Sequence, residues 1–169
     1  MKQLLKISFF AVLTISLFAF GACDKLKTLV IGYPSTFTVD VPVSAAAGTQ
    51  TSSKKDVANP VTTFLKDKGI DIAAVDAIEL ESMEAVIPST STLDFSDVSA
   101  VSFSFNGIVK AKLANPLAGK SAILPIAVPS VKADFLADKI SYDFNVTTNK
   151  ATPATTVTVK YKLNITYKL

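Results

Sequence analysis

The chain is 169 residues long and nearly balanced in charge, with 17 lysines against 14 acidic residues, so it lacks the clustered positive charge that nucleic-acid binding needs. It contains no arginine, histidine or tryptophan and a single cysteine, which excludes Ser-His and Cys-His catalytic pairs, a Cys/His zinc centre and a disulfide within the chain. Any general acid or base would have to be Asp, Glu, Lys or Tyr.

The first 22 residues have the three parts of a secretory signal peptide. Lys2 and Lys6 form a short basic start, and the run 7–22 that follows is apolar and contains no charged residue. A basic region, an apolar region and small residues at the cleavage site occur in this order in secretory signals. The sequence therefore predicts a signal peptide over residues 1–22.

The residues around the predicted cleavage site resemble the lipobox of bacterial lipoproteins. Phe20-Gly21-Ala22 leads directly into Cys23, the only cysteine. In that family a diacylglycerol is added to the thiol, the signal is cut before the cysteine, and the new amino group is acylated. The resemblance implies cleavage between Ala22 and Cys23 and lipidation of Cys23.

Two alternatives to a lipoprotein signal remain open at this point. One is an uncleaved membrane anchor, although the apolar run is somewhat shorter than the roughly 20 residues that a spanning helix requires. The other is a plain secreted protein.

Removal of the signal would leave 147 of the 169 residues, which is enough for one domain with a single core. We expect a lipid-anchored tether over residues 23–28 and a single domain over residues 29–169. The mature side chains would then carry 15 lysines against 14 acids, because Lys2 and Lys6 leave with the signal.

The start of the domain predicts a strand followed by a loop. Residues 36–43 alternate between polar and apolar, which is typical of a half-buried strand. Pro42 cannot donate a ladder hydrogen bond, so it indicates an edge or the end of that strand. Residues 44–57 are small and polar and predict a loop.

A short helix is predicted over residues 60–68. Asn59 is a favourable N-cap, Pro60 suits the first helical position, and Gly69 lies where a C-terminal glycine is expected. Because the helix is short and amphipathic, we expect it to close one end of a sheet core.

The middle of the chain predicts further strands. In residues 78–87 the apolar positions change parity, which indicates a bulge near Glu81-Ser82. The dipeptide Asn106-Gly107 is the strongest hairpin signal in the chain, and it predicts a turn between strands over 101–105 and 108–113.

The final third alternates most regularly. Residues 140–147 and 157–169 each place apolar side chains on one face, which predicts a long antiparallel hairpin with one buried face. Seven or eight short strands with one short helix predict a mainly β fold, a two-sheet antiparallel β-sandwich. We take an immunoglobulin-like strand order as the first hypothesis.

The order of these segments resembles a group of uncharacterised envelope lipoproteins from Bacteroidota. The resemblance covers about two thirds of the chain and implies a lipid-anchored β-sandwich of the cell envelope, with no activity attached. Its motifs are Ile78 to Val86, Leu93-Asp94-Phe95 leading to Val101-Ser102-Phe103, Phe135-Leu136-Ala137-Asp138-Lys139, and the lipobox ending in Cys23.

Three groups of carboxylates are candidate sites, as acid-base pairs or as calcium ligands. We favour the structural alternatives, which are a solvated strand face for the first group and turn or capping roles for the second. The groups are Glu79, Glu81 and Glu84 on one strand; Asp94 and Asp97 with Ser96 at a turn; and the more scattered Asp134, Asp138 and Asp143.

Lysines and tyrosines supply the remaining candidates. Lys160, Lys162 and Lys168 share one face of the last strand and would suit anionic headgroups or an acidic glycan. We favour a role in preventing edge-to-edge strand pairing. A row of exposed tyrosines would indicate a binding face, and the candidates for it are Tyr33, Tyr142, Tyr161 and Tyr167.

The leading hypothesis is a lipid-anchored lipoprotein of the bacterial cell envelope, in the outer membrane, that acts as a non-catalytic structural or interaction module. Its partners would be the membrane, through the N-terminal lipid, and an envelope protein or a glycan. No cofactor, no metal and no nucleic acid is expected. The alternative is a ligand-binding lipoprotein that captures a glycan, a lipid or a peptide. A third hypothesis is a hydrolase that uses carboxylates alone.

Overall fold

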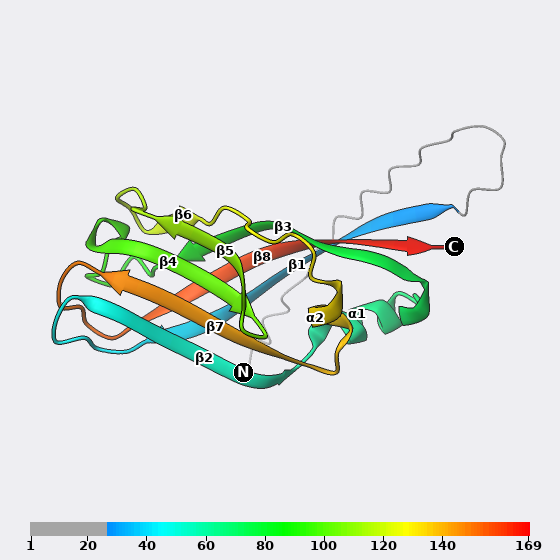
Figure 1. Cartoon of the computed structure of the whole chain (residues 1–169), viewed down its shortest axis with the longest axis horizontal. Coiled ribbons are helices and arrows are strands. Elements are labelled where there is room, and N and C mark those ends of the chain that lie inside the picture. The colour runs from blue at the N-terminus through cyan, green and yellow to red at the C-terminus, as the bar shows by residue number, and fades with distance from the viewer. Residues whose placement is uncertain (1–26) are drawn as a thin grey trace, which may run out of the picture.

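The computed structural model describes residues 27–169, so the signal peptide, its cleavage site and Cys23 lie outside the described residues. Two four-stranded antiparallel sheets pack face to face (Figure 1). The elements are β1 (Thr28–Val41), β2 (Gly48–Ala58), α1 (Pro60–Asp67), η1 (Ile72–Ala74), β3 (Val75–Val86), η2 (Phe95–Asp97), β4 (Val98–Phe105), β5 (Ile108–Ala114), β6 (Ser121–Ile123), α2 (Lys132–Leu136), β7 (Lys139–Thr148) and β8 (Thr155–Lys168).

The strand order identifies the sandwich as a jelly roll. One sheet has the order β1-β8-β3-β6 and the other β2-β7-β4-β5. Successive strands therefore cross from one sheet to the other, except for the β4–β5 hairpin, and eight strands connected in this way form a jelly roll. The two-sheet antiparallel sandwich is confirmed, whereas the immunoglobulin-like order is not, because there the first two strands are neighbours in one sheet.

The predicted hairpin of the final third is wrong in its pairing. Both strands form, but β7 pairs with β2 and β4, whereas β8 pairs with β1 and β3 in the opposite sheet. Alternation reports which face of a strand is buried and contains no information on the partner strand. The connection 149–154 therefore crosses between the two layers of the sandwich.

The buried faces of the strands form one core. Along β7 and β8 every second side chain is buried, as the alternation predicts. Aromatic rings fill the centre with centroids 4.8 to 6.1 Å apart, in stacked, tilted and edge-to-face arrangements that add to the gain from area burial. These rings are Phe37, Phe103, Phe105, Phe135, Tyr142 and Tyr161.

Two local predictions are confirmed in detail. The register of β3 against β8 shifts between Leu80 and Ser82, so the bulge lies at Glu81. The β4–β5 hairpin turns through Asn106 and Gly107, whose φ angles of 48° and 81° are both positive. Two positive φ angles are what a two-residue hairpin loop needs for its twist to match the strands.

The segment predicted as a loop over residues 44–57 is mostly strand β2, and that prediction is wrong. β2 has the sequence GTQTSSKKDVA, with almost no apolar residue on either face, so it carries no period-two signal. It is an edge strand, and hydroxyl and carboxylate groups of β7 satisfy its outer side chains. Thr49 bonds Thr147 at 2.8 Å, and Ser53 donates to Asp143 at 2.5 Å.

Helix α1 closes one end of the sandwich. The Asn59 side chain accepts a hydrogen bond from the backbone N–H of Val61, Pro60 occupies the first turn, and Gly69 has φ +68° beyond the helix end. Val61 and Leu65 point into the core, and the ring of Phe64 lies 4.8 Å from that of Tyr33 on β1. The predicted helix and its role at the end of the core are confirmed.

Both ends of the described chain lie at this same end of the molecule (Figure 1). Thr28 of β1 pairs with Lys168 of β8, and the N–H of Leu169 donates to the carbonyl of Lys27 at 3.0 Å. The opposite end is formed by the connections 42–47, 87–97, 115–120 and 149–154. We call these the anchor end and the loop end.

Candidate functional site

The segment that the sequence singles out most strongly enters the described domain at the anchor end. Cys23 and Ala22 lie outside the described residues, and β1 begins at Thr28. Among the described helices none is long and apolar enough to cross a membrane. The lipidation and cleavage at Cys23 stay predictions.

The three glutamates of β3 do not form a carboxylate site. They lie on the outer face of the β1-β8-β3-β6 sheet, and two of them form ion pairs with lysines of β8. Glu81 contacts Lys162 at 2.8 Å and Glu84 contacts Lys160 at 3.4 Å. Pairs this exposed contribute at most about 1 kcal/mol each, so they are a solvated strand face.

The acids of the predicted turn cap a single helical turn. The Asp94 carboxylate accepts from the backbone N–H groups of Ser96 and Gly119, both at 2.9 Å. The Asp97 carboxylate accepts from the N–H of Asp94 at 3.3 Å, which completes a capping box. It also pairs with Lys150 at 2.7 Å. These backbone hydrogen bonds, above all the one from Ser96, hold the pKa of Asp94 below its ordinary value. The capping role is confirmed.

The scattered aspartates differ from one another in environment. Asp143 lies on the outer face of β7, where hydrogen bonds from Lys55 and Ser53 lower the pKa of its carboxyl. Asp138 is exposed. Asp134, in contrast, is buried at the start of α2 and pairs with a residue that the sequence does not single out.

That residue is Lys110 of β5. Its Nζ lies 2.8 Å from Oδ2 of Asp134, and the two side chains are only 4% and 8% exposed. Nζ also donates to the carbonyl of Ser130 at 3.3 Å, and the Asn106 amide donates to Oδ1 of Asp134 at 2.9 Å. A buried ion pair persists only if such further hydrogen bonds satisfy it.

The network built on Lys110 and Asp134 fixes α2 against the β4–β5 hairpin. Asn106 accepts from the N–H of Ser141 at 2.9 Å, which extends the network to β7. A lysine and an aspartate 24 positions apart, each in an otherwise ordinary segment, give no local pattern in the sequence. With both charges engaged by each other, the pair serves in the packing of the fold.

The lysines of the last strand do not protect a sheet edge, so that interpretation is wrong. β8 lies between β1 and β3 and has no free edge. Lys160 and Lys162 pair with Glu84 and Glu81, and Lys168 lies 3.5 Å from Asp76.

The tyrosines do not form an exposed row. Tyr142 and Tyr161 are core residues, and burial raises the pKa of both phenols above the ordinary range. Tyr33 and Tyr167 are half-buried and pack against the core. The face of aromatic side chains that would favour glycan capture is therefore not present among the described residues.

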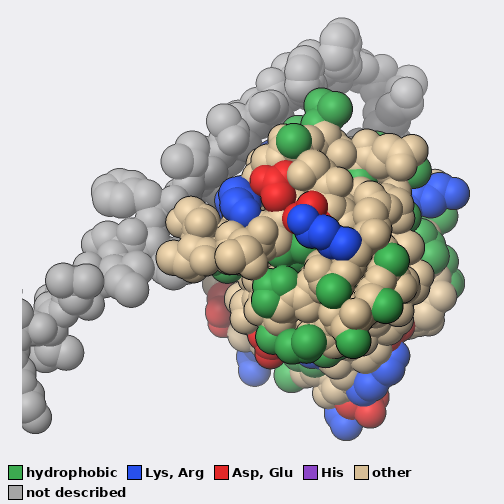
Figure 2. Space-filling view, turned by 90° about the vertical axis from the view of Figure 1, so that its left-hand side faces the viewer, with side chains coloured by type: hydrophobic (Ala, Val, Ile, Leu, Met, Phe, Trp, Pro, Cys, Tyr) green, Lys and Arg blue, Asp and Glu red, His purple; other side chains and the backbone are tan. Residues whose placement is uncertain are grey.

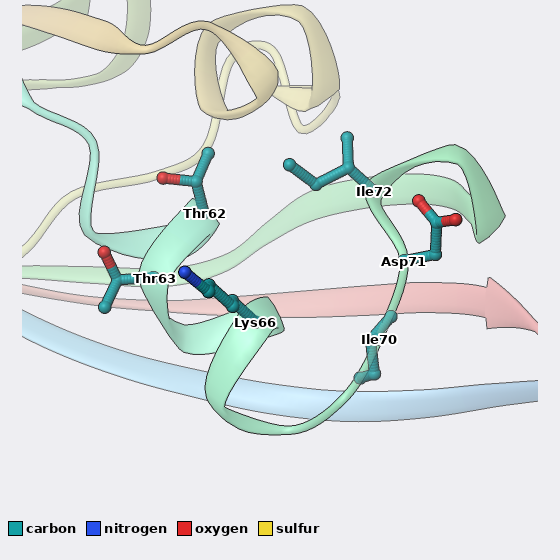
Figure 3. A pocket seen from close by; sticks show the side chains of 6 residues that line it. All are labelled: Thr62, Thr63, Lys66, Ile70, Asp71 and Ile72. Carbon is teal, nitrogen blue, oxygen red and sulfur yellow. The ribbon is translucent and has the colours of Figure 1, made fainter.

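Two hollows open at the ends of the sandwich. The smaller, of about 400 Å³, lies beside α1 at the anchor end, between Thr62, Thr63 and Lys66 of the helix and the turn 70–72. Figure 3 shows that the Lys66 ammonium and the Asp71 carboxylate do not point toward each other. The Asp71 carboxylate instead accepts from the N–H of Ala73 at 2.9 Å.

The larger hollow, of about 640 Å³, lies at the loop end. Prolines, serines and threonines of three connections line it, and its only carboxylate, Asp40, accepts from the Thr156 hydroxyl at 2.8 Å. Figure 2 looks onto this end and shows hydrophobic side chains spread over it, with basic and acidic ones near its middle and around its rim. No group of three metal-ligating side chains occurs among residues 27–169.

No protein-family model and no curated protein sequence matches this chain. Among solved structures, a chain described as desmodium yellow mottle tymovirus is similar, at 14% sequence identity and a TM-score of 0.35. The alignment covers 91% of this chain and 95% of that chain. A likeness at this level carries no information about function.

Proposed function

We propose that the protein is a lipoprotein of the bacterial cell envelope, held in the outer membrane by acyl chains on Cys23, and that its jelly roll is a non-catalytic structural or interaction module. The observation that carries the proposal is the sequence Phe20-Gly21-Ala22-Cys23 at the end of a basic and then apolar segment. Its resemblance to a lipobox implies the lipid, and its resemblance to Bacteroidota lipoproteins implies the envelope.

The physical basis of the anchor is the hydrophobic gain of the acyl chains. Each buried methylene contributes about 0.8 kcal/mol, yet a single chain gives only marginal, reversible membrane binding. Two or three chains on one residue make dissociation negligible. The domain then needs no membrane-spanning element of its own.

The described part of the domain supports a role without catalysis. The buried carboxylate Asp134 is neutralised by Lys110, and the acids of the turn cap a helix. The loop-end hollow, the larger of the two, offers hydroxyl groups and one engaged carboxylate. These groups suit contact with another macromolecule more than acid-base chemistry.

The experiment that tests the anchor compares two variants at the lipobox. Cys23→Ser replaces the thiol by a hydroxyl, and we expect an unprocessed precursor without acyl label when cells are grown with a labelled fatty acid. Ala22→Leu keeps the thiol but crowds the cleavage position, so a labelled precursor should accumulate. Normal processing and membrane retention of Cys23→Ser would refute the proposal.

A further inference from the structure

We propose that the anchor end of the jelly roll rests on the bilayer and contacts the phospholipid headgroups, with the loop end directed away from the membrane. This inference rests on the proposed function, because it requires acyl chains on Cys23 as the mature N-terminus. It adds the orientation of the domain and the surface that touches lipid.

The first step is the length of the tether. Cys23 lies four residues before Lys27, and four residues span at most about 14 Å when fully extended. The polar layer on each side of a bilayer is about 5 to 8 Å thick. A chain this short crosses that layer and leaves little further reach.

The second step is where the tether joins the domain. The Lys27 carbonyl accepts the N–H of Leu169 at 3.0 Å, and the next residue, Thr28, pairs with Lys168 in the β1–β8 ladder. The attachment point is thus part of the sheet. In any conformation of the tether, this end of the sandwich stays within about 14 Å of the acylated residue.

The third step is the chemistry of the anchor end. Val30 is 57% exposed and Ile72 is 41% exposed, so apolar side chains face outward beside the attachment point. Charged side chains of the described chain near this end include six lysines and four aspartates, which leaves an excess of positive charge. They are Lys27, Lys66, Lys68, Lys132, Lys139 and Lys168, with Asp67, Asp71, Asp76 and Asp138.

A surface of this composition fits a phospholipid headgroup layer. Lysines near an anionic bilayer contribute about 1 kcal/mol each, and exposed aliphatic side chains can enter the boundary between headgroups and acyl chains. Because one aspartate, Asp76, lies 3.5 Å from Lys168, part of the positive charge is already compensated. The tether supplies the proximity, and the lysine excess favours contact over separation.

The fourth step is the distance to the other end. β1 has 14 residues, which corresponds to about 45 Å at the rise of a β-strand. Leu117, 88% exposed in a connection of the loop end, therefore lies far from the bilayer when the anchor end touches it. The face seen in Figure 2 becomes the one presented to other envelope components.

The test uses the absence of tryptophan from the chain, because a single introduced tryptophan is then the only such fluorophore. Ile72→Trp and Val30→Trp report on the anchor end, and Leu117→Trp is the matched control at the loop end. All three positions are exposed, so the substitutions should leave the fold intact. Each acylated protein is reconstituted into phosphatidylethanolamine–phosphatidylglycerol vesicles with and without brominated acyl chains.

We expect brominated lipid to quench Ile72→Trp and Val30→Trp several-fold more strongly than Leu117→Trp. Equal quenching at both ends, or stronger quenching of Leu117→Trp, would overturn the orientation. An unquenched anchor end in protein that floats with the vesicles would also overturn it, although the lipid anchor would stand. If mass spectrometry shows Cys23 without acyl chains, the proposed function fails first, which separates the two failures.

Discussion

At the scale of single residues, Lys110 and Asp134 form the most deeply buried ion pair of the part of the chain that the structure describes. Both side chains are almost fully removed from water, so each depends on the other and on the hydrogen bonds from Asn106 and to Ser130. Removal of one partner leaves an uncompensated charge in the interior, and that is far more costly than the loss of the pair itself.

We therefore predict that Lys110→Met lowers the free energy of unfolding by about 3–5 kcal/mol. The double variant Lys110→Met/Asp134→Leu should recover most of this loss, because neither charge is then left alone. Lys160→Met is the matched control, since its exposed pair with Glu84 contributes about 1 kcal/mol or less. Urea unfolding of the wild type and these three variants measures the differences, and a Lys110→Met protein no less stable than the control would contradict the burial argument.

Asp94 gives a residue-scale prediction about pH. Backbone N–H groups of Ser96 and Gly119 lower the pKa of its carboxyl from the ordinary 3.8. Since the folded pKa is below the unfolded one, the contribution of Asp94 to stability is complete above the unfolded value. It is lost as the pH falls through the folded value.

We expect the free energy of unfolding of Asp94→Asn to fall less steeply than that of the wild type between about pH 5 and about pH 2, the range in which carboxyl groups titrate. Asparagine keeps the acceptor oxygen but does not titrate. Asp94→Asn/Asp143→Asn should be shallower still, because Lys55 and Ser53 lower the pKa of Asp143 in the same way. Parallel curves for all three proteins would show that these carboxyls do not contribute to acid unfolding.

At the scale of elements, α1 depends on one side chain that has two functions. Asn59 is buried, its Oδ1 accepts from the N–H of Val61 at 3.0 Å, and its Nδ2 donates to the carbonyl of Ala137 at 2.7 Å. The first bond caps the helix, and the second fixes the helix to the segment that follows α2. Either loss would loosen the closure of the anchor end.

Asn59→Ala removes both bonds, and we predict that the free energy of unfolding falls by about 1.5 to 2.5 kcal/mol. The cap contributes about 1 kcal/mol, and the hydrogen bond to the part-buried Ala137 carbonyl contributes about 0.5 to 1.5 kcal/mol. Asn59→Ser keeps an acceptor for the cap and loses the amide that reaches Ala137, so it should fall between. Asp71→Ala is the matched control, because Asp71 caps η1 in the same manner but is exposed. Thermal unfolding ranks the variants, and an equal effect of Asn59→Ala and Asp71→Ala would contradict the second function.

The sequence predicts the elements that have a local signal and misses those that depend on contacts between distant segments. The alternation in β7 and β8, the turn at Asn106-Gly107 and the cap at Asn59 are local signals, and each element they predict is present. β2 has no such signal, because an edge strand whose side chains bond the hydroxyl, amide and carboxylate groups of β7 needs no apolar face. The Lys110–Asp134 pair is missed for a related reason, since it forms only when distant segments meet.

At the scale of the whole molecule, the jelly roll separates two ends with different surroundings. All ladders other than β4–β5 join strands that are distant in the sequence, and folds dominated by such pairings fold slowly, in milliseconds to seconds. The pairing of β1 with β8 brings both ends of the described chain together. The sequence does not reveal this closure, because alternation specifies faces and leaves partners open.

The closure leads to a prediction that joins fold and function. Because the Lys27 carbonyl and the Leu169 N–H are 3.0 Å apart, a short glycine linker can connect them, and new termini can be opened between Leu117 and Ala118, both exposed at the loop end. Domains with adjacent termini usually tolerate such circular permutation. We expect the permutant to keep its far-UV circular dichroism spectrum with a modest loss of stability.

If residues 1–26 are then placed before Ala118, the acylated cysteine lies at the loop end. The short tether then holds the jelly roll with its loop end toward the membrane. In the brominated vesicles, a tryptophan at position 72 should lose its quenching, and one at position 117 should gain it. The native protein with the same substitutions is the control. A permutant that folds and is acylated but keeps the native quenching pattern would show that the surface of the anchor end, and not the point of attachment, determines the orientation.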